Sequence, residues 1–153
     1  MNIGFSEDEV DTSASTRKAR LKWVIVVNRD LPIGRIVNAA TCVAAATAPA
    51  VTGLLGPDGK DADGSAHPGL PWAGCTILAA DAETLRKIRA SGVARDDIYV
   101  ADMPLTAQET RVYDGYLERL AESSADEIEY GAVSLVGPRN PVDRLVGRLP
   151  LLT

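Results

Sequence analysis

Short polar side chains gather where an apolar run of the sequence gives way to a charged turn and a helix-like segment. Ligands of open α/β sheets bind beyond the carboxyl ends of strands, and a helix that starts there offers backbone N–H groups and a partial positive charge. An arginine at such a place adds paired donors that suit a carboxylate or phosphate. We therefore predict a site for a small anionic or polar ligand, formed by Asn28, Asp30, Arg35, Asn38, Thr41 and, from a later short strand, Asp102.

The same residues also have a purely structural interpretation. Asp30 is placed to cap the following helix, and the amide of Asn38 is able to tie two backbone segments together. In that case no ligand binds.

The elements that position these residues follow from hydrophobic patterning. Within the strand expected over residues 22–28, the run from Trp23 to Val27 is apolar without alternation, which is typical of a central strand buried on both faces. Pro32 and Gly34 break the strand and start a helix to about Ala48. This helix is apolar on two sides, so only the stripe that carries Arg35, Asn38 and Cys42 is free to meet solvent or a ligand.

The rest of the chain alternates strands and helices. We expect a long loop over residues 53–71, a strand over 72–80, a helix that Asp81 caps and Gly92 ends, and a strand over 98–101. Thr106 and Glu109 match a capping box for a helix to about Glu122. We expect one face of this helix to pack in the core, the face with Tyr113, Tyr116, Leu117 and Leu120. A strand over 129–136 and a short helix from Val142 close the chain. The predicted class is α/β, a three-layer α/β/α sandwich with a mixed sheet of about four strands.

Composition limits the classes of function. The length of 153 residues fits one domain, which we place at residues 21–153 behind an N-terminal arm at residues 1–20. We find no signal peptide and no apolar run long enough for a bilayer, so we expect a cytoplasmic protein without membrane contact. One histidine and two cysteines, Cys42 and Cys75, are too few for a zinc site, and we expect both thiols to be buried. We predict no metal and no cofactor.

Two blocks of the sequence resemble the type II peptidyl-tRNA hydrolases. The first is KWVIVVNRDLPIGRIVNAATCVAAA, residues 22–46, in which Lys22, Asp30, Gly34 and Cys42 fall in register with that family's first strand and helix. The second is AVSLVGPRNPVDRLVGRLPLL, residues 132–152, which is similar to its last strand, Gly-Pro turn and final helix. The resemblance implies the same scaffold, with the residues between Thr106 and Glu122 as an insertion.

The family activity does not carry over with the scaffold. Where the resembling family has a lysine, a glutamine and a histidine on its first helix, this sequence has Val37, Thr41 and Ala44. Val37 and Ala44 have no titratable group or donor in their side chains, so they supply neither proton transfer nor oxyanion stabilisation. The net charge of −5, and ten acidic against two basic residues over 96–130, also argue against tRNA as a partner.

Three hypotheses of function therefore remain open. The first is a protein of unknown function on this scaffold that binds a small molecule, with its catalytic residues, if it has any, unknown. The second is hydrolysis of the ester between peptide and tRNA, which the basic residues of the segment 17–35 favour. The third is a non-enzymatic interaction module that forms a homodimer or larger homo-oligomer through the arm or the inserted helix.

Overall fold

A mixed sheet lies at the centre of the protein, in a computed structural model that describes residues 2–153. Its four strands are, in spatial order, β4 (Thr76–Ala80), β1 (Leu21–Asn28), β6 (Tyr130–Pro138) and β5 (Tyr99–Pro104). β1 runs parallel to β4 and antiparallel to β6, and β6 runs antiparallel to β5. The central position of β1, predicted from its continuous apolar run, is confirmed.

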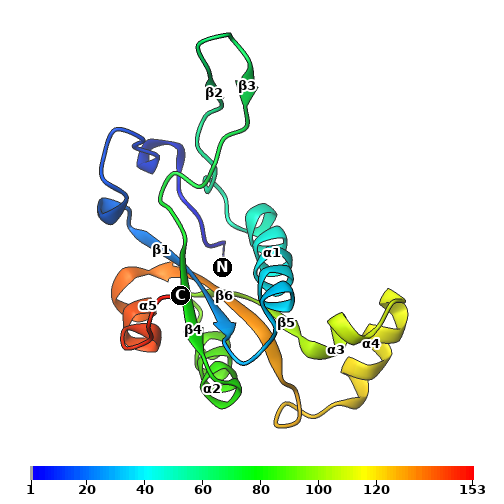
Figure 1. The fold of residues 1–153 in the computed structure, drawn as a ribbon. Coiled ribbons are helices and arrows are strands. Elements are labelled where there is room, and N and C mark those ends of the chain that lie inside the picture. The colour runs from blue at the N-terminus through cyan, green and yellow to red at the C-terminus, as the bar shows by residue number, and fades with distance from the viewer. Residues whose placement is uncertain (1) are drawn as a thin grey trace.

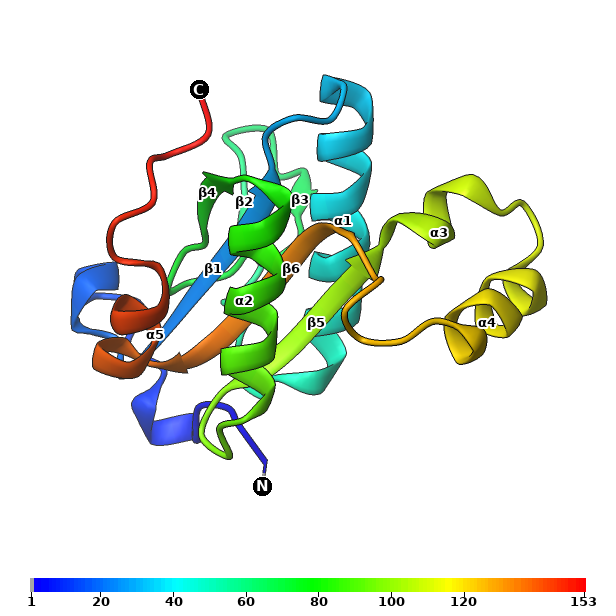
Figure 2. The same cartoon turned by 90° about the horizontal axis from the view of Figure 1, so that it is seen from below.

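Helices cover both faces of this sheet (Figure 1; Figure 2). α1 (Ile33–Ala50) lies over Trp23, Ile25 and Val27 of β1. α2 (Ala82–Val93) and α5 (Arg139–Val146) lie over Val24 and Val26. Because successive side chains of a strand point to opposite faces, a strand covered on both sides needs apolar residues at every position. The predicted α/β/α class with a mixed four-stranded sheet is confirmed.

The N-terminal segment is packed against the body of the protein. It contains two short 3-10 helices, η1 (Glu7–Glu9) and η2 (Thr16–Lys18). Phe5 is buried, its ring lies 4.8 Å from the ring of Trp72, and its N–H donates to the carbonyl of Thr52 at 2.8 Å. Arg20 pairs with Glu9, which places the pKa of the Glu9 carboxyl at about 2. The contacts of Phe5 hold the segment against the body, and the pair of Arg20 with Glu9 connects two parts of the segment itself.

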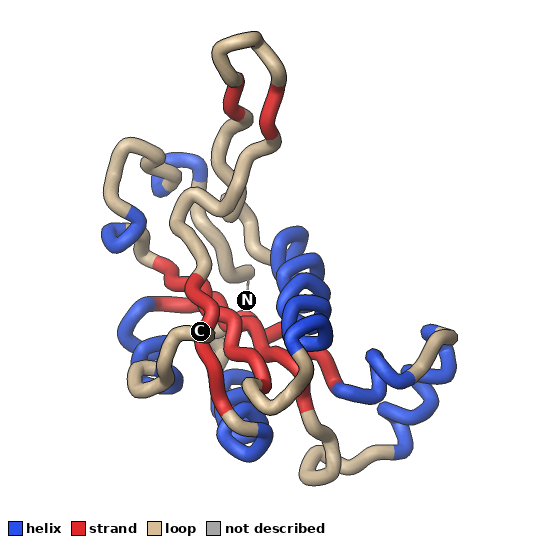
Figure 3. The backbone as a smooth tube through the Cα atoms, viewed as in Figure 1, coloured by secondary structure: helices blue, strands red, loops and turns tan. Residues whose placement is uncertain are grey.

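The connection between α1 and β4 contains more structure than the sequence predicted. A two-stranded hairpin, β2 (Gly59–Lys60) and β3 (Ala66–His67), projects from the body within the expected loop (Figure 1; Figure 3). The Asp61 carboxylate accepts backbone N–H bonds from Asp63 and Ser65, which stabilises the hairpin turn. The expected strand over 72–80 begins only at Thr76, because Gly74 adopts φ +76 in a turn.

The helix expected over residues 106–122 is two helices. α3 (Leu105–Glu109) and α4 (Tyr113–Glu122) are separated by Thr110 and Val112, both of which have extended backbone angles. The capping-box interpretation was wrong, since Thr106 is already inside α3 and Pro104 occupies the N-cap. The core assignment for the α4 face was also wrong. α4 projects from the body, none of its residues is buried, and Tyr113 is 73% exposed (Figure 2).

Two further observations concern exposure. Cys42 and Cys75 are both exposed residues, whereas we expected buried thiols, and only the sulfur of Cys75 is partly enclosed. Cys42 lies on the outer stripe of α1, and Cys75 lies in the turn before β4.

Among residues 2–153, no helix has the length and apolar character needed to cross a membrane.

Candidate functional site

The turn after β1 is organised by the side chain of Asn28. Asn28 is 3% exposed, and its Oδ1 accepts the N–H of Asp30 at 3.0 Å. The Asp30 side chain is exposed and does not cap α1, whose N-cap position is Pro32 without a side-chain hydrogen bond. The structural interpretation of Asp30 as a helix cap is therefore wrong. Asn28, in contrast, has a definite role in shaping the turn that leads into α1.

Three predicted residues lie on the exposed side of α1. Arg35 and Asn38 are joined by Gln108 of α3, whose Nε2 donates to the carbonyl of Arg35 at 2.9 Å and to Oδ1 of Asn38 at 3.1 Å. Thr41 donates its hydroxyl to the carbonyl of Val37 at 2.8 Å. Sequence reasoning missed Gln108, because no local pattern links two positions 70 residues apart.

Asp102 of β5 is oriented toward the opposite helix layer. Its Oδ2 accepts a hydrogen bond from Nε of Arg89 on α2 at 3.0 Å, and the Arg89 guanidinium lies 5.6 Å from the centre of the Tyr130 ring. Its neighbours Ala101 and Met103 belong to the core beneath α1. The structure thus places five predicted residues at the end of β1 and along α1, and the sixth in an ion pair with α2.

A hollow of about 420 Å³ lies beyond the open edge of β5, and we call it the edge hollow. Because β5 is the outer strand of the sheet, its neighbouring residues Asp102 and Met103, which point to opposite faces, both line this hollow. α1 contributes Cys42, which is one helical turn from Asn38 on the same stripe. We define the edge hollow by six of its lining residues, Cys42, Asp102, Met103, Arg111, Tyr113 and Tyr116.

Of the two charged side chains that line the edge hollow, only Asp102 has a partner of opposite charge in the described part of the chain. Asp102 is offset by Arg89, whereas Arg111 forms no ion pair with any carboxylate of residues 2–153. Burial, with a smaller contribution from Asp102, raises the pKa of Tyr116, so its hydroxyl stays neutral at physiological pH. The rings of Tyr113 and Tyr116 meet edge to face at 5.5 Å. The hollow therefore combines aromatic walls with one uncompensated cation.

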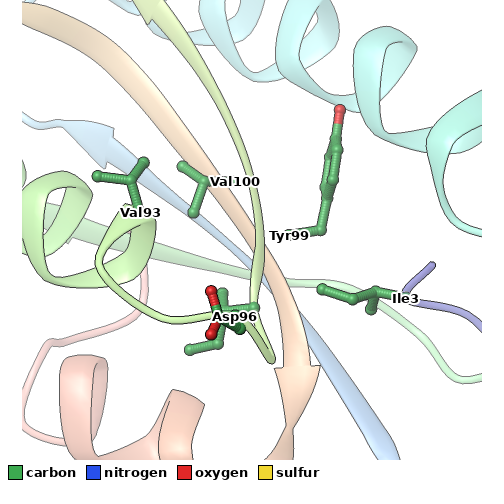
Figure 4. Close-up of a pocket in the computed structure, with 6 residues that line it drawn as sticks. Ile3, Val93, Asp96, Tyr99 and Val100 are labelled. Carbon is green, nitrogen blue, oxygen red and sulfur yellow. The ribbon is translucent and has the colours of Figure 1, made fainter. Parts of the chain in front are cut away.

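A second hollow, of about 500 Å³, surrounds the start of β5. Figure 4 shows its side chains on both sides of the strand, with Tyr99 directed toward α1 and Val100 on the side of α2, to which Val93 belongs. The Tyr99 hydroxyl donates to the carbonyl of Ala46 at 3.2 Å. This hollow wraps around a strand edge and contains one charged side chain, Asp96, which makes it a poorer receptor for an anion.

The described part of the chain contains no cluster of side chains suited to a metal site. Within residues 2–153, no three His, Cys, Asp or Glu side chains are grouped to hold a metal ion. The single histidine, His67, lies in the exposed hairpin 3.3 Å from Asp61.

These features define an α/β sandwich domain with a hollow at the open edge of its sheet. The chain belongs to a protein family of unknown function (DUF2000), whose model matches residues 21–153. A solved structure of a protein of unknown function from Agrobacterium tumefaciens is similar in fold, with a TM-score of 0.80, at 19% sequence identity over 88% of this chain and 98% of that one. No curated protein matches the chain. Neither the family model nor this solved structure is described as a peptidyl-tRNA hydrolase.

Proposed function

We propose that the protein binds a small molecule with an apolar body and an anionic or polar head group in the edge hollow. The observation that carries this proposal is the combination of aromatic walls and the uncompensated Arg111 in a cavity of about 420 Å³. Ligand sites are typically concave, largely apolar and furnished with a few placed polar groups. Met103, Tyr113 and Tyr116 supply contact for the body, and Arg111 supplies donors for the head group.

The residues predicted at the end of β1 extend this proposed site along α1. Asn38 lies one turn from Cys42, and Gln108 already bridges Asn38 and Arg35. A head group that reaches beyond Cys42 meets Asn38, Thr41 and Arg35 in turn. Asn28 and Asp30 shape the turn from which α1 starts, and Asp102 holds Arg89 beside the hollow.

We propose, from the sequence resemblance, that the protein has the scaffold of the type II peptidyl-tRNA hydrolases without their reaction. Val37 is 56% exposed on α1, so the position that is a lysine in the resembling family faces solvent here as an aliphatic side chain. Ala44 adds no proton donor or acceptor. We therefore propose binding of a small molecule as the function and leave the family reaction as the alternative.

An anionic naphthalene dye tests the proposal directly. Anilinonaphthalene sulfonate has an apolar body and one sulfonate, and its fluorescence rises when it leaves water. We expect Arg111→Gln to weaken its binding about tenfold, the effect of losing one charge-assisted hydrogen bond. Arg119→Gln is the matched control, because Arg119 is an exposed arginine of α4 outside the edge hollow.

A neutral dye separates charge from shape. N-phenylnaphthylamine has the same body without the sulfonate, so Arg111→Gln should leave its affinity unchanged, while Tyr116→Ala should weaken both dyes. Equal affinities of the sulfonate dye for the Arg111 and Arg119 variants would contradict the proposed role of Arg111. Unchanged binding of both dyes to the Tyr116 variant would place the site elsewhere.

A further inference from the structure

A third cavity lies at the start of β1, and it shares no lining residue with the edge hollow. It has a volume of about 490 Å³ and lies between η2, the start of β1, the turn before β4 and the start of α5. Arg17, Lys22 and Arg139 are the charged residues that line it, and no carboxylate does. We call this cavity the basic pocket. Its other walls include the ring of Trp23 and residues 73–76.

Two of the three cations, Arg17 and Arg139, have no carboxylate partner among residues 2–153 to offset their positive charge. Lys22 pairs with Asp143 of α5. Arg139 donates from Nε to the carbonyl of Ala19 at 2.8 Å and from an Nη to the carbonyl of Thr16 at 2.6 Å. Carbonyl oxygens orient a guanidinium but leave its charge in place. Neither Arg17 nor Arg139 forms an ion pair with a carboxylate in the part of the chain that the structure describes.

The walls of the basic pocket are held by defined local structure. Ser15 caps η2, accepting the N–H of Arg17 at 3.4 Å, which orders the backbone from which the Arg17 side chain extends. Gly74 adopts φ +76 in the turn that forms the opposite wall, a conformation that disfavours other residues. Cys75 is exposed as a residue, but its sulfur is partly enclosed, and this burial raises the pKa of the thiol to about 12, so the wall carries no negative charge at neutral pH.

We propose that the basic pocket binds the phosphate group of a small molecule. Arg139 is half-buried, and an unpaired charge in such a place costs free energy unless an anion offsets it. Guanidinium groups match the oxygens of a phosphate in geometry as well as in charge. Trp23 and Ala73 offer apolar contact for whatever carries the phosphate. This site is independent of the edge hollow.

Amide chemical shifts recorded by NMR during a titration test the proposal with two probes. Inorganic phosphate and phenyl phosphate are each added to the full chain, with sodium chloride at equal ionic strength as the reference. We expect both probes to shift the amides of Arg17 and residues 73–76. Tighter binding of phenyl phosphate would show that the pocket takes a phosphate ester, and equal affinities would show that it takes the free ion.

Matched charge variants decide whether the binding is local. Arg17→Gln removes a side chain that makes no hydrogen bond in the described structure, so the fold should be unaffected. We expect it to weaken phosphate binding about tenfold. Arg144→Gln, an exposed change of the same charge on α5 outside the pocket, should have no effect. Equal loss in the two variants, or no shift at residues 73–76 with either probe, would overturn the proposal.

Discussion

Ser134 of β6 lies in the middle of a buried chain of hydrogen bonds between the sheet and α1. Nε1 of Trp23 donates to Oγ of Ser134 at 2.8 Å, the hydroxyls of Ser134 and Thr47 are 2.8 Å apart, and Thr47 donates to the carbonyl of Val43 at 2.7 Å. With Ser134 as donor to Thr47, every polar atom in the chain has a partner. A satisfied network of this kind fixes how α1 sits on the sheet.

Thr47→Val tests this network with Thr41→Val as its control. Both threonines lie on α1 and donate to the carbonyl four residues earlier, but only Thr47 is buried and bonded to Ser134. We expect Thr47→Val to lower the free energy of unfolding by about 1–3 kcal/mol, because Ser134 loses its acceptor. Thr41→Val should change it by less than about 0.5 kcal/mol. Urea denaturation measures both, and equal losses would refute a special role for the network.

We predict that the protein does not cleave peptidyl-tRNA at a meaningful rate, because of the side chains at Val37 and Ala44. Their side chains supply neither proton transfer nor charge, so cleavage should be slower by orders of magnitude than in a genuine hydrolase of that family. A release assay with labelled peptidyl-tRNA measures the rate. Turnover comparable to a genuine hydrolase would move catalysis to residues outside our proposed site.

At the scale of elements, some local signals predicted their elements correctly, whereas the capping box at Thr106 did not and distant contacts were not predicted. β1 followed from its apolar run, and α2 followed from Asp81, whose side chain accepts the N–H of Thr84 at 2.7 Å. The division of α3 from α4 at Thr110 had no strong local signal. Gln108, which joins Arg35 and Asn38, became visible only once tertiary structure brought α3 beside α1. The end of β1 was predicted correctly from the sequence, but the edge hollow was not, because it combines α1 with the distant residues 102–116.

We predict that the stability contributed by the Asp81 cap of α2 depends on pH. Hydrogen bonds from Thr84 lower the pKa of the Asp81 carboxyl below its ordinary value of 3.8. The stabilisation is therefore present above the unfolded-state pKa and lost as pH falls through the folded-state pKa. We expect Asp81→Ala to lower the urea midpoint at pH 7, Asp81→Asn to retain most of the stability, and the difference between wild type and Asp81→Ala to shrink below pH 3.8. A difference that persists unchanged in acid would contradict the capping account.

At the scale of the whole molecule, the two edges of the sheet differ, because one is covered by another segment of the described chain and the other is not. The last residues cover β4, since the N–H of Ala79 donates to the carbonyl of Pro150 at 2.9 Å and the N–H of Leu152 donates to the carbonyl of Ile77 at 3.1 Å. β5 has no such covering strand among the described residues, and the edge hollow lies there. One edge is thus protected, and the other is available for recognition.

Truncation after Arg148 tests the protective role of the last residues. It leaves backbone groups of Ile77 and Ala79 unpaired at the β4 edge. We expect a lower urea midpoint and increased light scattering on heating, because an uncovered edge strand favours association. Removal of Thr153 alone is the control and should change neither quantity. Identical stability of the long truncation and the control would show that the segment is not part of the fold's energetics.

We place the ligand site at the β5 edge beside α1. The most direct measurement of that placement is an amide chemical-shift map of the protein with bound anilinonaphthalene sulfonate. We predict that the largest shifts fall at Cys42, Met103, Arg111 and Tyr116, with smaller shifts at Asn38. Shifts centred on the hairpin around His67, or on the hollow at the start of β5, would contradict the assignment.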